Sequence, residues 1–192
     1  MLHLASASPR RADLLRQLGA PFAVIPDCAV DETPVPGESP AVYVTRLAQA
    51  KAADGQARLA LADAWVLGAD TCVEVDGVLL GKAEDAAAAR IMLMQLSGRS
   101  HRVFTGLCLL RGEECLTQTV CTQVSFAPLS PACLDAYLAT GEWQGKAGSY
   151  AIQGKAGAFI SHLNGSYTNV VGLPLFETAQ LLQQAGQAYW QE

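Results

Sequence analysis

The amino-acid sequence predicts an α/β fold with a mixed sheet and flanking helices. Short apolar segments in the first third of the chain each lead into a helical pattern, as in strand-helix units whose strands can pair in parallel. Two longer segments, residues 100–110 and 115–126, are separated by a tight turn at 111–114, so we expect them to pair antiparallel. Hydrophobic residues make up 51% of the 192-residue chain and charged residues 16%, which is enough apolar material to bury such a sheet.

The first helix begins at a serine-proline pair that follows an apolar strand at residues 2–5. Ser8 suits the N-cap, where its hydroxyl accepts a backbone N–H, Pro9 suits the first helical position, and Gly19 suits the stop. The same serine-proline start recurs at residues 39–40 and 130–131. We therefore interpret it as an ordinary helix start that carries no functional information.

The remaining elements follow from periodicity and turn signals, with Asp76-Gly77 as the strongest hairpin signal. Before the two long strands we expect a strand at 22–25, a loop at 26–40, a helix from 40 with Lys51 near its end, a short helix at 57–62, a strand at 64–75 interrupted by Gly68, a strand at 78–80 and a helix at 84–96. After them we expect a helix at 130–140, a glycine-rich, backbone-lined loop at 145–160, a strand at 159–163 and a closing helix at 174–187. The length, without any long linker in the sequence, predicts a single domain over residues 1–192 with room for two lobes.

Composition and charge exclude several classes of partner. The net charge of -5 argues against general nucleic-acid binding, which needs a basic face. No apolar segment approaches the roughly 20 residues that span a bilayer. The six cysteines show neither a C-x-x-C pair nor a Cys/His cluster with zinc spacing. The first residues do not have the pattern of a secretory signal, so we expect a cytoplasmic protein that binds neither nucleic acid nor membrane.

Two arginines occupy the first turn of the first helix, where the partial positive charge of a helix N-terminus disfavours cations. Arg10 and Arg11 each cost a few tenths to about 1 kcal/mol there, whereas the other two serine-proline starts carry uncharged residues at the equivalent places. A bound phosphate held by backbone N–H groups and both guanidinium groups would reverse this cost. In the alternative interpretation, the arginines point into solvent or pair with acidic residues elsewhere.

Asp70 ends the apolar run at residues 65–69. A carboxylate at the exposed end of a buried strand is rigidly held and yet meets solvent, which favours a role in catalysis or metal binding. The alternative is a strand-terminating aspartate that caps the next turn. Glu32, Lys51 and Lys82 are each, taken alone, more typical of solvated surface charges.

The set of charged residues is more informative than its members. Two carboxylates, Asp70 and Glu32, suit a divalent cation and a water, while two lysines and two arginines suit phosphate oxygens. Attack on a phosphoryl group needs charge neutralisation and positioning more than a nucleophilic side chain, and the sequence shows no placed Cys-His or Ser-His pair. We interpret His3, His101 and His162, which lie in strand-like runs, as structural. The inventory predicts a site that cleaves nucleotides.

Short blocks of sequence spread over nearly the whole chain carry a family resemblance. They are Ser6-Ala7-Ser8-Pro9-Arg10-Arg11, Val30-Asp31-Glu32-Thr33, Arg46-Leu47-Ala48 with Lys51, Gly68-Ala69-Asp70-Thr71, Gly81-Lys82, Ser97-Gly98, Lys146-Ala147-Gly148 with Ile152-Gln153-Gly154, and Val171-Gly172-Leu173-Pro174. In this order they resemble the Maf family.

The resemblance implies a cytoplasmic nucleoside triphosphate pyrophosphatase that depends on a divalent metal, Mg or Mn, and cleaves a nucleotide to its monophosphate and pyrophosphate. The implied fold is similar to that of inosine triphosphate pyrophosphatases, an elongated α/β structure with two lobes around a central cleft, and it is compatible with a homodimer. Carried onto this sequence, Asp70 accepts the proton of the attacking water, and Glu32, also counted in the catalytic set, is its partner toward the metal or the water. Ser8, Arg11, Lys51 and Lys82 hold the triphosphate, with Lys82 also counted in the catalytic set.

Three positions indicate the subfamily. The branch that acts on 7-methyl-GTP has tryptophan, glutamine and glutamate where this chain has Arg10, Thr71 and Gln153, and the pattern here resembles the branch that acts on dTTP and UTP. The amide of Gln153 both donates and accepts, as a pyrimidine edge requires. Ala83 departs from the proline that many relatives have after the lysine, which affects the rigidity of that loop. Two alternatives remain, a nucleotide-binding regulator of cell division without turnover and a pyrophosphatase for 7-methyl-GTP.

Overall fold

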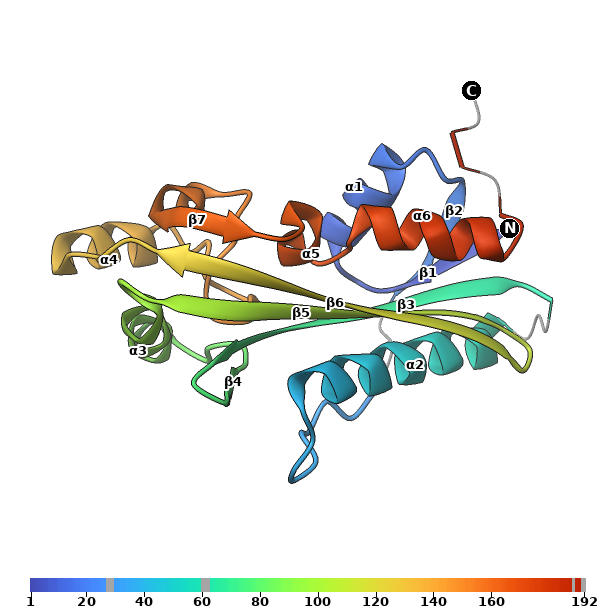
Figure 1. Ribbon diagram of the computed structural model, residues 1–192, viewed down its shortest axis with the longest axis horizontal. Coiled ribbons are helices and arrows are strands. Elements are labelled where there is room, and N and C mark those ends of the chain that lie inside the picture. Colours follow the sequence, from blue (N-terminus) through green and yellow to red (C-terminus); the bar gives the residue numbers. More distant parts are fainter. Residues whose placement is uncertain (27–29, 60–62, 188, 191–192) are drawn as a thin grey trace. The chain divides into compact units, whose positions relative to one another are not determined.

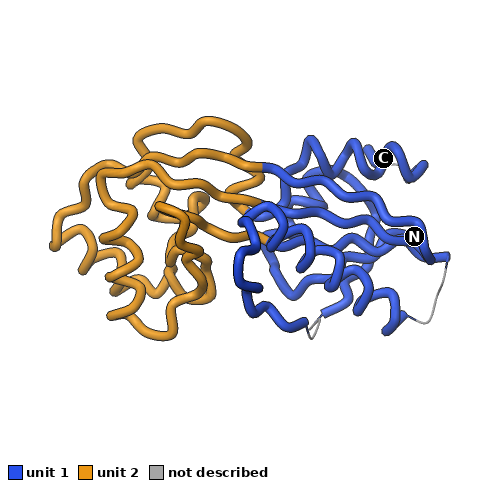
Figure 2. Tube along the Cα trace, turned by 60° about the horizontal axis from the view of Figure 1, so that its bottom comes forward, with its two compact units in different colours: residues 1–70, 105–120, 172–192 blue, residues 71–104, 121–171 orange. Residues whose placement is uncertain are grey.

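The computed structural model describes residues 1–26, 30–59, 63–187 and 189–190. The chain divides into two compact units, drawn in different colours in Figure 2. Unit 1 consists of residues 1–70, 105–120 and 172–192, and unit 2 consists of residues 71–104 and 121–171. Three long strands contribute residues to both units, namely β3 (Trp65–Val75), β5 (Ser100–Arg111) and β6 (Glu114–Phe126). The predicted mixed sheet is confirmed, with the strand order β2-β1-β3-β5-β6-β7 and with β4 paired to β3.

In unit 1, three parallel strands form the part of the sheet that carries Asp70. Strand β1 (Leu2–Ala5) pairs with β2 (Phe22–Ile25) on one side and with β3 on the other. All four residues of β1 are buried, as a central strand requires. Helix α2 (Pro40–Leu59) lies on one face of these strands and α6 (Leu175–Gln184) on the other, as Figure 1 shows.

Helix α2 is longer than the sequence indicates. The expected end near Lys51 and the separate helix at 57–62 are wrong, because residues 57–59 continue α2, while residues 60–62 lie outside the described part. Gly55 lies inside this helix, at a place where a Cβ would meet the Ala5 Cβ at 2.9 Å and the Val66 Cγ1 at 3.0 Å. The glycine that resembles a helix breaker is therefore a close packing contact, and tertiary packing overrides its low helix propensity.

Two further glycines, one on each of two sheet strands, let α2 approach the sheet. A Cβ on Gly68 of β3 would lie 2.2 Å from the carbonyl oxygen of Ala48, and one on Gly106 of β5 would lie 2.4 Å from that of Val44. Real Cβ atoms do not come this close to a backbone oxygen. The backbone of α2 therefore rests directly on these two strands.

Helix α1 (Pro9–Gln17) begins at Pro9, as expected, and Gly19 follows it with a φ of 73°. One detail of the prediction is wrong, because the Ser8 side chain makes no capping hydrogen bond. The other two serine-proline starts do have their caps: the Ser39 hydroxyl accepts from the Val42 N–H at 3.3 Å, and the Ser130 hydroxyl accepts from the Cys133 N–H at 3.2 Å.

Unit 2 contains the β3–β4 hairpin and the helices of the second half of the chain. Asp76 and Gly77 form the turn before β4 (Val78–Leu80) with φ values of 52° and 82°, as the hairpin signal predicts. The other elements of this unit are α3 (Ala86–Leu96), α4 (Pro131–Ala139), the 3-10 helix η1 (Lys155–Phe159), β7 (Ile160–Asn164) and α5 (Tyr167–Val171).

Two segments of unit 2 differ from the expectation. The glycine-rich loop at 145–160 is confirmed through its turns, but its last residues form η1, and α5 has no counterpart among the predicted elements. Both are only five residues long, which is too short for a helical period to be recognised in a sequence. In the described part of the chain, no helix combines the length and the apolar composition needed to cross a lipid bilayer.

Candidate active site

Asp70 is the last residue of β3 that belongs to unit 1, and it is buried with 7% of its surface exposed. Successive side chains of a strand point to opposite faces, so Val66, Gly68 and Asp70 share one face. Val66 and Gly68 both contact α2, which places the Asp70 carboxylate on the same face. The period-two pattern of this strand therefore directs the aspartate toward the helix that carries Lys51.

Lys51 reaches Asp70 from α2. Its ammonium donates to Asp70 Oδ1 at 2.6 Å and is also 2.7 Å from Glu32 Oε1. Glu32 comes from the loop at 30–39 that precedes α2, so three separate segments of unit 1 meet at one nitrogen. Two carboxylates share one cation, which leaves this group of three side chains with an excess of one negative charge.

Arg11 lies close to the same carboxylates. Its Nε donates to the carbonyl oxygen of Gly172 at 2.8 Å, and its Nη1 donates to Ser6 Oγ at 3.4 Å. Burial lowers the pKa of Arg11, while the charges of Asp70 and Glu32 raise it. The solvent-facing alternative for this arginine is therefore wrong, because the guanidinium is directed inward, within electrostatic reach of both acids.

Arg10 is half-buried, and burial lowers its pKa as well. Its charge adds to the lowering of the Arg11 pKa, so the two guanidinium groups are close enough to repel one another. An anion between or beside them would remove that repulsion. The phosphate interpretation of these two arginines stays a prediction.

Ser6 is a residue that the sequence reasoning missed. It is buried, and its hydroxyl oxygen accepts both the backbone N–H of Ser8 at 3.1 Å and the Nη1 of Arg11. Ser6 therefore holds the backbone at the start of α1, while the Ser8 hydroxyl is not used as a cap. The only sequence signal was the Ser-Ala-Ser spacing, which does not tell which of the two serines serves the backbone.

The other candidate residues, Thr71, Lys82 and Gln153, belong to unit 2. Lys82 is exposed after β4 and pairs with Ala147 through an isolated antiparallel bridge, beside a hydrogen bond from the Gly148 N–H to the Gly81 carbonyl at 3.1 Å. Gln153 is exposed within the glycine-rich loop. The loop that carries Gln153 is thus bonded through its backbone to the segment that carries Lys82.

The cluster of Asp70, Glu32 and Lys51 contains only two side chains of a kind that binds metal ions, the two carboxylates. Among the described residues, no cluster of three or more histidine, cysteine, aspartate or glutamate side chains could hold a metal ion. Asp70 and Glu32 are the two carboxylates that share a cation here, and hard oxygen donors of this kind suit Mg²⁺ or Mn²⁺. A protein site with one or two carboxylates is usual for Mg²⁺ when substrate phosphates and waters complete the shell.

The fold is that of a known structural class. The Staphylococcus aureus Ham1 protein superposes with a TM-score of 0.52 at 13% identity, over 97% of this chain and 99% of that one. This likeness confirms the expected α/β fold. At that identity it shows the fold alone.

The family follows from the sequence comparisons. The family model for Maf-like proteins matches residues 1–185, so the chain belongs to the Maf family. A dTTP/UTP pyrophosphatase of Alcanivorax borkumensis is 50% identical over 192 residues, covering 100% of this chain and 98% of that protein. The dTTP/UTP pyrophosphatases of Symbiobacterium thermophilum and Agrobacterium fabrum are 53% and 51% identical, over 96% of this chain and 94% and 92% of theirs.

Proposed function

We propose that this protein is a nucleoside triphosphate pyrophosphatase that hydrolyses dTTP and UTP to the monophosphate and pyrophosphate. The observation that carries the proposal is the Lys51 ammonium held between Asp70 and Glu32, with Arg11 beside them. Relatives that are about half identical over their full lengths have this activity in their names, which supports the same substrates here. Residues 1–192 would act as a single domain, since one family model matches residues 1–185.

The phosphate-binding groups would be Ser8, Arg11, Lys51 and Lys82. Arg11 offers a planar fork for phosphate oxygens, and its inward direction is fixed by its bond to the Gly172 carbonyl. The Ser8 hydroxyl stands at the start of α1 without a capping bond, and the helix N-terminus favours an anion at that place. For Lys82, the proposal rests on the family resemblance alone.

Asp70 would accept the proton of the attacking water, and Asp70 and Glu32 would together hold a divalent cation. The two carboxylates fit such an ion, because a single cationic nitrogen already contacts an oxygen of each. A bound Mg²⁺ or Mn²⁺ would supply positive charge to the phosphate oxygens and lower the pKa of water. Lys51, whose ammonium contacts both carboxylates, would offer its positive charge to the phosphate oxygens.

Base selection would fall to Arg10, Thr71 and Gln153. The Gln153 amide can donate to a pyrimidine carbonyl and accept from the adjacent N–H, whereas a glutamate could only accept. Changing Gln153→Glu is therefore expected to lower kcat/KM for dTTP and UTP relative to other bases. Unchanged relative kcat/KM values across a base panel would refute this role.

The test is pyrophosphate release from a panel of triphosphates that contains dTTP, UTP, CTP, 7-methyl-GTP and modified pyrimidines, with Mg²⁺ or Mn²⁺. We expect dTTP and UTP to be preferred, and we expect Asp70→Asn to reduce release by roughly 10²- to 10⁴-fold, as loss of a general base does. Nucleotide binding by this variant, measured by calorimetry, should persist. Asp13→Asn, which changes an exposed carboxylate of α1 that pairs with Arg16, is the matched control.

Two outcomes would overturn the proposal. Wild-type protein that binds nucleotide but releases no pyrophosphate from any member of the panel would indicate a regulator without turnover. A clear preference for 7-methyl-GTP would assign the chain to the other branch. The homodimer and the cytoplasmic location stay predictions, to be checked by light scattering and by cell fractionation.

A further inference from the structure

The loop that carries Glu32 has little apolar packing to hold it. Residues 30–39 form neither helix nor strand, and nearly all of them are exposed, including Val35 at 53%. The Glu32 side chain itself is 43% exposed. Because burial contributes little to its position, the direction of this carboxylate depends on polar contacts of the loop.

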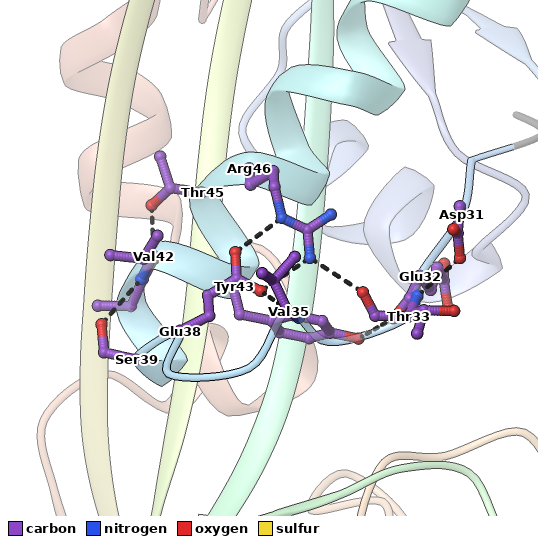
Figure 3. A network of polar contacts seen from close by, with 11 residues as sticks. Asp31, Glu32, Thr33, Val35, Glu38, Ser39, Val42, Tyr43, Thr45 and Arg46 are labelled. Atoms are coloured by element: carbon purple, nitrogen blue, oxygen red, sulfur yellow. Dashed lines mark hydrogen bonds and ion pairs between the residues drawn. The ribbon is translucent and has the colours of Figure 1, made fainter.

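Two side chains from the first turns of α2 hold two consecutive backbone carbonyls of the loop, those of Glu32 and Thr33. The Tyr43 hydroxyl donates to the carbonyl oxygen of Glu32 at 2.8 Å, and Arg46 Nη2 donates to the carbonyl oxygen of Thr33 at 3.2 Å. Figure 3 shows both bonds reaching from the helix to the loop. Lys51, further along the same helix, contacts the Glu32 carboxylate, so α2 holds both the backbone and the side chain of this residue.

Arg46 is itself fixed by a two-point ion pair with Glu38, at the end of the same loop. Its Nε lies 2.7 Å from Glu38 Oε1 and its Nη2 lies 2.8 Å from Oε2. Glu38 Oε2 also accepts the backbone N–H of Val35 at 3.1 Å. The guanidinium carbon lies 5.6 Å from the ring centroid of Tyr43, so the two tethering side chains also contact one another. The planar fork of the guanidinium suits this two-point pair with the carboxylate and also brings Nη2 within reach of the Thr33 carbonyl.

We propose that Tyr43 and Arg46 are positioning residues that aim the Glu32 carboxylate at the Lys51 and Asp70 cluster. This inference rests on the proposed role of Glu32 in holding a divalent cation. Neither residue needs to touch the nucleotide. Their effect is to fix the backbone from which Glu32 projects, so that its carboxylate need not be ordered at the moment of ion binding.

The variants for the test remove the tethers with little other change. Tyr43→Phe deletes the hydroxyl, and Arg46→Lys keeps the charge but loses the fork. Thr45→Val is the control on the same turn of α2, because the Thr45 hydroxyl bonds to the Ala41 carbonyl at 2.7 Å and to Thr119 Oγ1 at 2.6 Å and not to the loop. Figure 3 shows Thr45 on a different side of the helix from Arg46.

Mn²⁺ binding to the nucleotide-free protein, followed by the paramagnetic resonance signal of free Mn²⁺, is the first readout. We expect Tyr43→Phe and Arg46→Lys each to weaken binding by roughly 10-fold, the usual effect of removing a group that orients a metal ligand. In a Glu32→Gln background the same substitutions should have no further effect, because the group they position is gone. Equal losses in both backgrounds would show a merely structural role and overturn the proposal.

Amide hydrogen exchange gives a second readout that needs no turnover. Exchange at Thr33 and Val35 should quicken in Arg46→Lys and stay unchanged in Thr45→Val. Wild-type Mn²⁺ affinity and unaltered exchange in both tether variants would refute the inference even if the enzyme hydrolyses dTTP. Absent pyrophosphate release by the wild type, together with the expected changes in exchange, would refute the proposed function and leave the positioning geometry supported.

Discussion

Gly68→Ala tests whether the close approach of α2 to β3 is required for both stability and the site. The added Cβ would lie 2.2 Å from the Ala48 carbonyl oxygen, 2.7 Å from the Ala52 nitrogen and 3.1 Å from the Ala52 Cβ. Ordinary carbon-oxygen contacts begin at about 3.3 Å. The helix backbone therefore has to move by about 1 Å, because no flexible side chain can yield in its place.

The cost follows from the kind of atom that is in the way. Overpacking a core costs about 1–3 kcal/mol, occasionally more, and an obstacle made of helix backbone belongs at the upper end. For a chain of this size, a loss of about 3 kcal/mol lowers Tm by roughly 6–12 °C. Asp70 lies two residues further on the same face of β3, and Lys51 lies on the displaced helix, with 2.6 Å between Nζ and Oδ1. A displacement of about 1 Å at such a site can cost roughly 100-fold in kcat/KM.

The assay is thermal and urea unfolding together with pyrophosphate release, and the control is Gly81→Ala. A Cβ on Gly81 meets nothing within 4 Å, and the φ of Gly81 is not in the left-handed region. The free energy of unfolding of the Gly81→Ala variant should therefore stay within about 0.5 kcal/mol of the wild-type value. If Gly68→Ala has the Tm and the activity of the wild type, the packing of α2 does not set the Lys51 position and the reasoning is refuted.

Three further predictions concern single side chains. Lys51→Met leaves the buried carboxylate of Asp70 without its cation and should lower the free energy of unfolding, measured by urea titration, by about 3 kcal/mol. It should also abolish turnover. An unchanged midpoint of the urea titration would contradict the ion-pair account. Burial lowers the pKa of His101 from 6.5 to about 4, so between these pH values the unfolded chain binds a proton that the folded protein does not. The contribution of His101 to the free energy of unfolding is therefore complete above pH 6.5, and about 3 kcal/mol of it is lost as the pH falls to 4. His101→Phe should remove this slope of stability against pH, and a persistent slope would assign it to another group. Ser130→Ala removes a helix cap and should lower the free energy of unfolding by about 1 kcal/mol. Ser8→Ala should lower it by less than half of that and should still lower kcat/KM. Equal losses of stability in the two variants would show that Ser8 is also a cap.

The sheet was predictable because its signals are local. Apolar strands, a two-residue turn at Asp76-Gly77 and serine-proline helix starts each depend on neighbours in the sequence, and each is confirmed. The length of α2 was not predictable in this way. Gly55 has a helix-breaking propensity, and only the tertiary contact with Ala5 and Val66 explains why the helix continues through it.

The candidate site was predictable in its residue types and less so in its contacts. Asp70 followed from its place at the end of an apolar run, and the structure brings Lys51, Glu32 and Arg11 to it. The hydrogen bond from Arg11 to the Gly172 carbonyl joins residues 161 positions apart. Because every residue has a backbone carbonyl, the residue type at the acceptor position could not predict this bond. Tyr43 likewise looks like an ordinary residue of a helix face, because its contact with the Glu32 carbonyl depends on a loop whose path has no periodic pattern.

Packing and chemistry share one face of β3 in this protein. Because side chains on a strand alternate, the face that turns Asp70 toward Lys51 also turns residue 68 toward the backbone of α2. A side chain at position 68 would push the backbone of α2, which carries Lys51, away from the strand that carries the carboxylate. We therefore expect the charge cluster, as well as the fold, to require glycine at position 68. Second-site substitutions that restore the activity of Gly68→Ala should lie among the residues that contact α2 and not among the charged residues.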